Sequence, residues 1–336
     1  MGTATGLLTE GHVLRVLDLE VKFFTYAGVV HAVSGVSFEV FEGEVVSLVG
    51  ETGCGKTVTT RAITRLIEPP GRITSGSVLY RTRSGRVVDL LKIPDEELRS
   101  IRGDEIAYVF QDPTSALDPL YTVGAHIVET VKAHRKASTK DIIRRAVKLL
   151  AETLIPNPEL RVRNYPHELS GGMRQRAVIS IGLSNSPRLL IADEPTTNLD
   201  VTVQAQILDL LRDLRSRYGM SLILITHNLG VVAEMADRVY VMYAGKVVEE
   251  AATEELFYSP AHPYTALLLK AVPNPAKRVE KLETIPGTVP SLINPGPGCR
   301  FEPRCPYAMG VCGREEPPLV EVGRGHRAPC WLLAKR

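Results

Sequence analysis

The eight residues 50–57, GETGCGKT, constrain the fold of this chain more than any other segment. They fit the pattern G-x-x-x-x-G-K-[S/T], which forms the phosphate-binding loop of ATP- and GTP-hydrolysing proteins. Glycines at Gly50, Gly53 and Gly55 let the backbone turn tightly, so that successive N–H groups face inward and bind an anion. A helix that begins near Lys56 adds the positive end of its dipole. The segment therefore predicts a nucleotide phosphate site.

The segments on either side of this loop supply the context that the motif needs. Residues 44–49 form a largely apolar, β-branched run, as in a buried strand, and residues 58–67 have a helical pattern. A chance match on a glycine-rich turn is the alternative, and the order strand, loop, helix argues against it. In the loop, Lys56 is predicted to reach the β- and γ-phosphates and the Thr57 hydroxyl to bind Mg²⁺. The predicted contacts of the phosphates are Gly50, Glu51, Thr52, Gly53, Cys54, Gly55, Lys56, Thr57 and Val58.

Length, charge and hydropathy limit the class of protein. The chain has 336 residues and is 44% hydrophobic, which suffices for one large or two medium domains. A formal net charge of +2 favours neither nucleic acid nor an acidic ligand as partner. No apolar stretch approaches the roughly 20 residues that span a bilayer, and the first residues do not resemble a signal peptide. We therefore expect a cytosolic location, where the five cysteines need an explanation other than disulfides.

Hydrophobic patterning predicts a mostly parallel α/β sheet. Residues 105–110, 188–193 and 221–226 are apolar runs typical of buried strands, and they alternate with helical patterns such as residues 201–217. Residues 12–26 instead alternate apolar and polar, which predicts an edge-type antiparallel strand.

Two further stretches differ from this α/β pattern. The chain between Gln111 and Pro187 is largely helical in pattern, which predicts a helical insertion. Beyond about Glu255, proline and glycine become dense and four cysteines cluster, which predicts a separate C-terminal extension.

Two acidic residues follow one of the predicted strands. Asp193 ends the apolar run RLLIAD, where a carboxylate holds the Mg²⁺ shell in phosphate-loop enzymes. Glu194 follows it and is predicted to polarise the attacking water as a general base. An ordinary acidic pair at a strand end is the alternative, and the phosphate loop favours the catalytic interpretation.

The segment LSGGM places a serine and two glycines at the start of a predicted helix. Ser170 is predicted to cap that helix, while Gly171 and Gly172 allow another group to approach the backbone closely. The start of a helix with bare backbone also binds anions, so the segment is either a simple N-cap with a tight turn or a second phosphate contact.

Taken together, GETGCGKT, VFQDP, LSGGM, LLIADEP, NLD and ITHN resemble the ATP-binding subunit of an ABC transporter, in the family's order over residues 14–252. The resemblance implies an α/β phosphate-loop core, with a mostly parallel sheet and an antiparallel β subdomain, over residues 12–255. It also implies a helical subdomain over about residues 115–186. Two such domains are expected to close head to tail on ATP and Mg²⁺. Each ATP then contacts one subunit's phosphate loop and the partner's Ser170, Gly171 and Gly172.

The resemblance assigns catalytic roles to two more residues. Gln111 is expected to contact Mg²⁺ and the attacking water and to sense the membrane partner. His227 is expected to contact the γ-phosphate and to help hold Glu194. The expected catalytic residues are Lys56, Gln111, Glu194 and His227, and the expected Mg²⁺ ligands are Thr57, Gln111 and Asp193.

The resemblance also implies contacts with the base and across the dimer. Asp200 matches the loop that crosses the dimer interface, with a simple cap on the following helix as the alternative. Tyr26 is expected to stack on adenine, with Phe23 and Phe24 as alternatives, and any of the three could instead be a core aromatic. The thiol of Cys54, inside the phosphate loop, is expected to make the ATPase sensitive to alkylation.

Three segments, QDPTSALDP, FYSPAHPYTALLLKAVP and PGTVPSLINPGPGCRFEPRCPYA, resemble the oligopeptide/dipeptide importers within the ABC family, and specifically their D-type subunit. The resemblance implies a metal-stapled C-terminal extension over residues 256–336. It implies as partners a related F-type ATPase, two membrane permeases and an extracytoplasmic solute-binding protein, with no nucleic acid, and a peripheral position on the cytoplasmic face of the membrane. Oligosaccharides or nickel are alternative solutes. A soluble ABC ATPase acting on nucleic acid or ribosomes and a non-catalytic regulatory or metal-sensing module are the rival classes.

Four cysteines lie in the C-terminal extension. Four thiolates in a loop-rich segment can hold a tetrahedral zinc ion or a 4Fe–4S cluster, and either would supply folding energy that a small core lacks. The resemblance to D-type subunits implies the 4Fe–4S cluster. Zinc and four reduced, unliganded thiols remain alternatives, and His326 is close enough in sequence to substitute as a ligand. The cysteines are Cys299, Cys305, Cys312 and Cys330.

Overall fold

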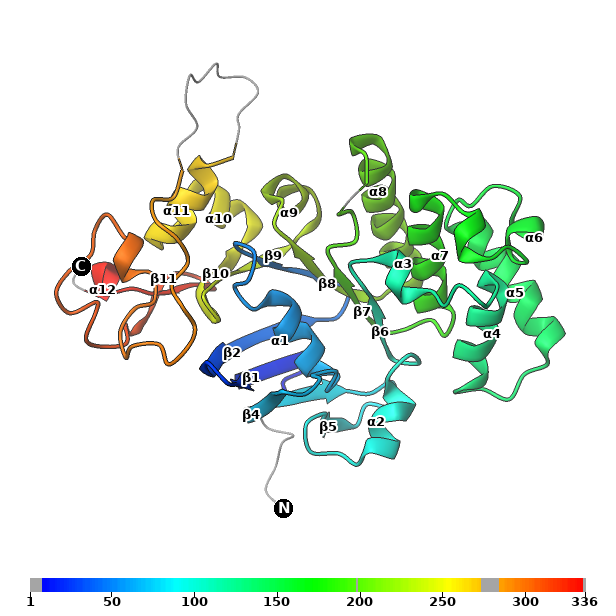
Figure 1. The fold of residues 1–336 in the computed structure, drawn as a ribbon, viewed down its shortest axis with the longest axis horizontal. Helices are drawn as coiled ribbons and strands as arrows, with labels where there is room; N and C mark the ends of the chain where they lie inside the picture. The colour runs from blue at the N-terminus through cyan, green and yellow to red at the C-terminus, as the bar shows by residue number, and fades with distance from the viewer. Residues whose placement is uncertain (1–7, 198, 273–283, 335–336) are drawn as a thin grey trace.

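The computed structural model describes residues 8–197, 199–272 and 284–334. Two β-sheets form the middle of the molecule, and helix α1 (Lys56–Ile63) lies between them in Figure 1. An arm of helices occupies one end of the long axis and the C-terminal region occupies the other.

The smaller sheet is antiparallel, with the order β2-β1-β4-β5. Its strand β1 alternates buried and more exposed side chains, as the sequence predicts. The prediction that this strand is an edge is wrong, because Val16 of β1 pairs with both Phe38 of β2 and Val78 of β4. Strand β1 therefore has β2 on one side and β4 on the other. The strands are β1 (His12–Thr25), β2 (Gly28–Phe41), β4 (Gly71–Arg81) and β5 (Val87–Asp89).

The larger sheet has the order β11-β12-β10-β9-β3-β8-β7-β6. The five strands from β9 to β6 are parallel, and β10, β12 and β11 add to them as antiparallel strands. Every residue of β3, β7 and β8 is buried, as expected for parallel strands covered on both faces. The strands are β3 (Val45–Val49), β6 (Ile106–Val109), β7 (Leu189–Asp193), β8 (Ser221–Thr226), β9 (Arg238–Tyr243), β10 (Lys246–Ala252), β11 (Leu319–Gly323) and β12 (His326–Pro329).

Alternation along β3 shows what covers each face of the larger sheet. Val46 and Leu48 pack in the cluster that contains the apolar residues of the antiparallel sheet. Val45 points the other way and packs with Ile207 and Leu211 of α8 (Val201–Tyr218). The antiparallel sheet and α8 therefore lie on opposite faces of the parallel strands.

The predicted helical insertion is the arm of Figure 1. Its helices start at polar side chains that accept a backbone hydrogen bond, such as Thr122 before α4 and Ser138 before α5. Ile127, Ala146 and Ala177 belong to the arm's own apolar core. The helices from this region are α2 (Asp95–Ile101), which precedes the arm, then α3 (Pro113–Ala116), α4 (Val123–Lys132), α5 (Thr139–Glu152), α6 (Pro158–Arg161), η2 (Pro166–Glu168) and α7 (Gly171–Leu183).

The C-terminal region continues the larger sheet, whereas the sequence predicts a separate extension. Glu250 of β10 pairs with Arg327 of β12, so the terminal hairpin adds two strands to the sheet. Phe301 is buried in the same apolar cluster as Tyr243 of β9. The remaining helices are α9 (Leu229–Met235), α10 (Thr253–Tyr258), α11 (Pro263–Lys270), η3 (Glu302–Arg304) and α12 (Trp331–Ala334).

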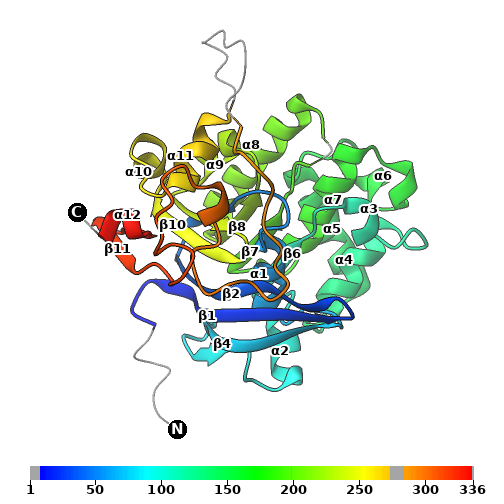
Figure 2. The ribbon, with the colours of Figure 1, turned by 60° about the vertical axis from the view of Figure 1, so that its left-hand side comes forward.

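Residues 284–301, which precede η3, also return to the antiparallel sheet. Figure 2 shows their orange trace crossing in front of α1 and β2. Ile293 forms an isolated antiparallel bridge with Val30 of β2, and the His31 N–H donates to the Leu292 carbonyl at 2.8 Å. The C-terminal region therefore contacts both sheets.

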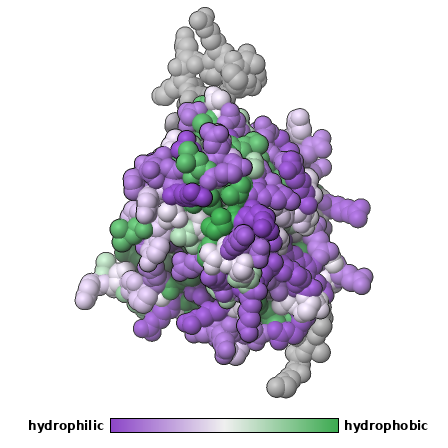
Figure 3. Space-filling view, turned by 90° about the vertical axis from the view of Figure 1, so that its right-hand side faces the viewer, coloured by the Kyte–Doolittle hydropathy of each residue, from purple (hydrophilic) through white to green (hydrophobic). Residues whose placement is uncertain are grey.

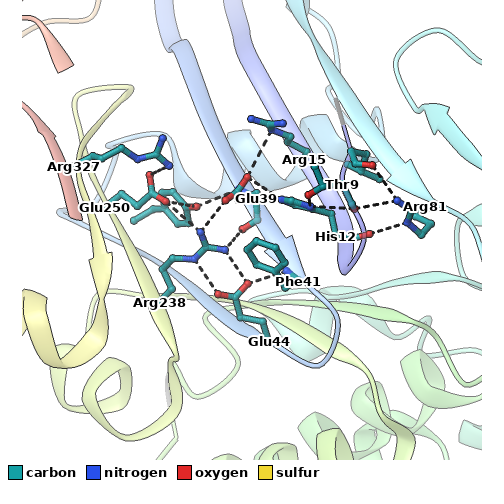
Figure 4. Close-up of polar contacts among 12 residues, drawn as sticks. Thr9, His12, Arg15, Glu39, Phe41, Glu44, Arg81, Arg238, Glu250 and Arg327 are labelled. Carbon is teal, nitrogen blue, oxygen red and sulfur yellow. Dashed lines mark hydrogen bonds and ion pairs between the residues drawn. The ribbon is translucent and has the colours of Figure 1, made fainter. Parts of the chain in front are cut away.

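A network of ion pairs joins the two sheets and the C-terminal region at the amino ends of β3 and β9 (Figure 4). Arg238, the first residue of β9, donates from Nε and Nη2 to the two carboxylate oxygens of Glu44, both at 2.9 Å. Its Nη1 lies 3.2 Å from Glu39 of β2 and 3.3 Å from Glu250 of β10. Glu250 also pairs with Arg327 of β12 at 2.7 Å. One arginine, with its side chain 14% exposed, thus links both sheets and the C-terminal hairpin.

None of the helices formed by residues 8–197, 199–272 and 284–334 is long and apolar enough to cross a membrane.

Candidate active site

The predicted phosphate loop connects the end of β3 to the start of α1. Gly50, Gly53 and Gly55 all have positive φ angles. A side chain on Gly50 would meet the Met242 carbonyl oxygen at 2.1 Å, and one on Gly55 would meet the Ala32 carbonyl oxygen at 2.5 Å. The two glycines are therefore required because the loop packs closely against β9 and β2.

The ammonium group of Lys56 lies inside the curve of this loop. Lys56 is 5% exposed, and its Nζ donates to the carbonyl oxygens of Gly50 at 2.8 Å and Glu51 at 3.1 Å. The inner side of such a loop is where phosphates bind, and the contact of Lys56 with them stays a prediction. Thr52 is exposed at the turn and Val58 is half-buried on α1.

Cys54, in the same loop, is 1% exposed. Burial raises the pKa of its thiol, although the nearby Lys56 acts in the opposite direction. Because alkylating reagents need an accessible thiolate, the burial argues against the predicted sensitivity to alkylation.

Two of the three predicted magnesium ligands, Thr57 and Asp193, are in contact at the end of β7, whereas the third, Gln111, contacts Glu194. The Thr57 hydroxyl donates to Asp193 Oδ1 at 3.0 Å. The Tyr108 hydroxyl donates to Asp193 Oδ2 at 2.9 Å and lies 3.1 Å from the Thr60 hydroxyl. Burial raises the pKa of the Asp193 carboxyl group, and the hydrogen bonds from Tyr108 and Thr57 partly offset this. Burial and the neighbouring Asp193 carboxylate also raise the pKa of Tyr108.

Sequence reasoning missed Tyr108. Its one signal is position, since it belongs to the apolar strand β6 that ends two residues before Gln111. The register pairs Tyr108 with Ile191 of the neighbouring strand β7, two residues before Asp193. The tyrosine hydroxyl thereby reaches the carboxylate at the strand end.

Three side chains from different segments hold the Glu194 carboxylate. Gln111 Nε2 donates to Glu194 Oε2 at 3.0 Å, and the Thr197 hydroxyl donates to the same oxygen at 2.9 Å. His227 Nδ1 lies 3.2 Å from Glu194 Oε1. The structure thus brings together the three predicted residues Gln111, Glu194 and His227 and adds Thr197.

The backbone of Glu194 is itself unusual. Its φ is 45°, in the left-handed region that costs a non-glycine residue about 1–2 kcal/mol. Its N–H donates to the Ile225 carbonyl of β8 at 2.9 Å, which holds the residue in this conformation. The turn lets Asp193 and Glu194, neighbours in sequence, serve different partners.

The LSGGM segment lies on the arm, apart from the phosphate loop in Figure 1. Ser170 caps α7 by accepting from the Met173 N–H at 3.3 Å. A side chain on Gly172 would meet Val203 Cγ1 at 2.9 Å, so this glycine lets α7 approach α8. Asp200 caps α8 by accepting from the Val203 N–H at 2.9 Å. Both predicted caps are present, and the starts of the two helices lie side by side.

The three aromatic candidates for the base differ in packing. Phe23 packs against the main apolar cluster, and Phe24 lies under the Arg72 guanidinium at 5.5 Å. Tyr26 is exposed in the turn between β1 and β2. Its contact with adenine stays a prediction.

The four C-terminal cysteines line one small cavity together with Phe301 and Trp331. None of them forms a disulfide. Burial, followed by the neighbouring cysteines, raises the pKa of Cys299 to about 11. His326 does not join them as a substitute ligand, because its Nε2 contacts the buried Glu249 carboxylate at 2.8 Å. Within the described parts of the chain, no group of three or more His, Cys, Asp or Glu residues is arranged to hold a metal ion.

Comparison with known proteins agrees with this geometry. Residues 33–197 match the family model of the ABC transporters, and residues 248–312 match the model described as the C-terminal region of oligopeptide/dipeptide transporters. Among similar solved structures is a dimeric ATP-binding cassette, MJ0796, bound to ADP and Pi. It has a TM-score of 0.63 and 27% identity, over 71% of this chain and 98% of that one. The cassette protein cbiO1 of Clostridium perfringens has a TM-score of 0.61 and 27% identity, over 74% and 92%.

The chain belongs to the ABC transporter family and has its ATP-binding cassette fold. It is an ATP-hydrolysing subunit of that family. The dipeptide transport ATP-binding protein DppD of Bacillus subtilis is 46% identical over 96% of each chain. The oligopeptide transport ATP-binding protein OppD of the same organism is 48% identical, over 95% of this chain and 88% of its own.

Proposed function

We propose that this subunit powers the import of dipeptides or oligopeptides through membrane permeases. The observation that carries the proposal is the 46–48% identity to DppD and OppD over nearly the whole chain, including the C-terminal region. Oligosaccharides and nickel are the alternative solutes, because the ATP-hydrolysing subunit does not itself contact the solute.

In the proposed hydrolysis, Glu194 acts as the general base. The attacking water gives a proton to its carboxylate and bonds to the γ-phosphorus, while the bond from that phosphorus to the ADP oxygen breaks. Gln111, Thr197 and His227 fix both carboxylate oxygens at 2.9–3.2 Å, which orients the base. Lys56 stabilises the negative charge that develops on the phosphates.

The residues near Asp193 fit a magnesium ion. Mg²⁺ prefers oxygen ligands, and the Asp193 carboxylate lies 3.0 Å from the Thr57 hydroxyl. Thr57, Gln111 and Asp193 are the proposed ligands. When bound, the ion neutralises charge on the β- and γ-phosphates.

The proposed active form is a head-to-tail dimer with a related ATPase subunit. Helix α7, which begins with Gly171 and Gly172 after the cap Ser170, lies apart from α1 in Figure 1, which supports a role for these residues on the partner's nucleotide. Asp200, beside them at the start of α8, lies at the proposed interface. The dimeric form of the similar cassette MJ0796 is consistent with this arrangement.

The helical arm is the proposed contact with the permeases. Figure 3, which faces the end of the arm, shows hydrophobic residues gathered among hydrophilic ones. Large apolar side chains exposed on the arm are Leu120, Tyr121, Leu154, Leu160 and Tyr165. Gln111 follows β6 just before α3, so a displaced arm would move a residue that holds Glu194.

We place the subunit, in this proposal, on the cytoplasmic face of the membrane, supplied by an extracytoplasmic solute-binding protein. The proposed domains are residues 12–255, with the helical subdomain at about 115–186, and residues 256–336. Residues 273–283, 335 and 336 of the latter lie outside the described part of the chain.

For the four cysteines we propose a 4Fe–4S cluster. In such a cluster each iron binds one thiolate, so the four sulfurs surround a cube and do not converge on one ion. The four cysteines line one cavity, which supports a shared bound group, and the resemblance to D-type subunits favours the cluster over zinc. Anaerobic purification tests this: about four irons per chain with broad charge-transfer absorption supports the cluster, and stoichiometric zinc or no metal contradicts it.

Transport is tested in proteoliposomes that contain both permeases and both ATPase subunits. We expect ATP-dependent uptake of a labelled dipeptide supplied with the solute-binding protein, and none with Glu194→Gln in this subunit and the equivalent change in its partner. Uptake of labelled nickel or oligosaccharide without dipeptide uptake would contradict the proposed solute. Hydrolysis that responds to nucleic acid or ribosomes but not to permeases would favour the soluble class, and no basal hydrolysis would favour a regulatory module.

A further inference from the structure

The C-terminal region reaches into the phosphate loop through one arginine. Arg304 ends η3, the short turn between Cys299 and Cys305. Its Nη1 lies 2.7 Å from Glu51 Oε2 and its Nη2 lies 3.1 Å from Glu51 Oε1. Glu51 is the second residue of the phosphate loop, so a two-pronged ion pair joins the extension to the loop.

The Arg304 side chain is fixed before it reaches Glu51. It is 4% exposed, its Nε donates to the Pro286 carbonyl at 2.8 Å, and its Nη1 lies 3.3 Å from the Tyr243 hydroxyl. The guanidinium also lies over the Tyr243 ring, 5.7 Å from its centroid. A buried, prearranged arginine differs from a surface ion pair, whose side chains lose entropy on pairing and contribute little.

The backbone of Glu51 is held on both sides as well. Its N–H donates to the Tyr264 hydroxyl of α11 at 3.1 Å, and its carbonyl accepts from Lys56 Nζ at 3.1 Å. Tyr264 is fully buried, and its ring centroid lies 4.6 Å from that of Tyr243 and 5.3 Å from that of Phe301. The residue that positions a carbonyl on Lys56 is thus itself positioned by the C-terminal region.

We propose that Arg304 is a positioning residue of the ATP site, which acts through Glu51 on the shape of the phosphate loop. The inference rests on the proposed ATP hydrolysis and extends it, since it makes the C-terminal region part of the nucleotide site. Without Arg304, the half-buried Glu51 carboxylate loses its cation next to the incoming phosphates. The negative charge and the looser loop both weaken ATP binding, while Glu194 and its partners stay in place.

The test compares Arg304→Ala with Arg327→Ala in the purified subunit. Both arginines come from the C-terminal region and pair with a glutamate of the core, but only Arg304 touches the phosphate loop. We expect Arg304→Ala to raise the KM for ATP about tenfold and to change kcat less than about twofold, as for a residue that acts on binding. Arg327→Ala should leave KM unchanged.

A second pair of variants separates positioning from general loss of structure. Glu51→Gln removes the charge but keeps the side-chain shape, and should raise KM less than Arg304→Ala. In the double variant, KM should be no higher than in Arg304→Ala alone, since the charge that Arg304 neutralises is gone. Arg304→Lys should restore part of the affinity. Thermal unfolding midpoints of all variants identify those that lose structure, and Arg304→Lys and Glu51→Gln decide the question if Arg304→Ala does not fold.

Wild-type hydrolysis with an unchanged KM in Arg304→Ala, or equal changes in Arg304→Ala and Arg327→Ala, would overturn the inference and leave the proposed function standing. A wild-type chain that hydrolyses no ATP alone or with its partners would instead overturn the proposed function.

Discussion

The two ends of the parallel strands both gather carboxylates, but they bind them to different partners. At the carboxyl end of β7, Glu194 is held by the amide of Gln111, the hydroxyl of Thr197 and the imidazole of His227. At the amino end of β9, three glutamates surround the guanidinium of Arg238, which the network of Figure 4 shows.

The difference explains how one sheet supports both stability and chemistry. A carboxylate whose charge is neutralised by an arginine is a weak base, because protonation would break the pair. The Glu194 carboxylate is instead oriented by an amide, a hydroxyl and an imidazole. The carboxyl ends of parallel strands are also where ligands bind in α/β folds. We therefore assign the catalytic role to the first group and a structural role to the second.

The substitution Glu194→Gln has the largest expected effect, which is on the rate of ATP hydrolysis. Loss of the general base should lower ATP hydrolysis by about 10²- to 10⁴-fold and trap an ATP-bound dimer. Phosphate release and size-exclusion chromatography with ATP measure the two effects. Normal hydrolysis by this variant would show that the carboxylate is not the base.

The next effect concerns the amino-end network. Arg238→Ala leaves three carboxylates near one another without their cation, and should cost about 3–5 kcal/mol of unfolding free energy. Urea unfolding measures the loss. The control is Arg212→Ala, which removes an arginine paired with Asp209 and Glu234 whose side chain is 42% exposed, against 14% for Arg238, and should cost less than about 1 kcal/mol. Similar losses in both variants would contradict the structural role of the network.

A smaller effect is expected at Tyr108. Tyr108→Phe removes the hydroxyl that donates to Asp193, and should lower kcat/KM for ATP about tenfold, because hydrogen bonds to charged groups are the stronger ones. Tyr80→Phe is the control. Tyr80 lies on strand β4 of the other sheet, and its hydroxyl donates to Glu105 at 3.2 Å. Equal kcat/KM values for the two variants would remove Tyr108 from the site.

The smallest expected effect is a pH-dependent loss of unfolding free energy in Glu39→Gln. Burial raises the pKa of Glu39, but hydrogen bonds from His12 and Arg238 outweigh it, and the net pKa is lowered from 4.5. Because the folded chain has the lower pKa, the stabilisation is complete above pH 4.5 and is lost as the pH falls through the folded value. Glu39→Gln should therefore cost about 1 kcal/mol at pH 7 and progressively less below pH 4.5. Urea unfolding over this range checks it, and a cost that does not change with pH would contradict the assignment.

The sequence predicts the sites that short motifs form, but it does not predict contacts between residues far apart in the chain. The phosphate loop, the carboxylates after β7 and the caps at Ser170 and Asp200 depend on residues within a few positions, so their patterns are readable. Tyr108 reaches Asp193 only through the register of β6 against β7.

The sequence does not predict the contacts of Arg304 either. They depend on a C-terminal turn that returns to residue 51, more than 250 positions earlier in the chain. The prediction that β1 is an edge strand is wrong for a related reason. Alternation describes which side chains are buried, whereas the number of strand partners depends on where β4 returns. Likewise, Cys54 packs in the main apolar cluster with residues of both sheets, including Met242 of β9, which the loop sequence does not contain.

The most direct test of the account is one measurement on a matched pair of variants, Glu194→Gln and Glu250→Gln, at the two ends of the sheet. ATP hydrolysis per folded molecule and urea unfolding are measured side by side. We expect Glu194→Gln to lose at least about 100-fold in rate with its unfolding free energy within about 0.5 kcal/mol of wild type. Glu250→Gln should lose about 2 kcal/mol with its rate within about twofold. If rate and stability fall together in either variant, the division of roles between the two ends is wrong.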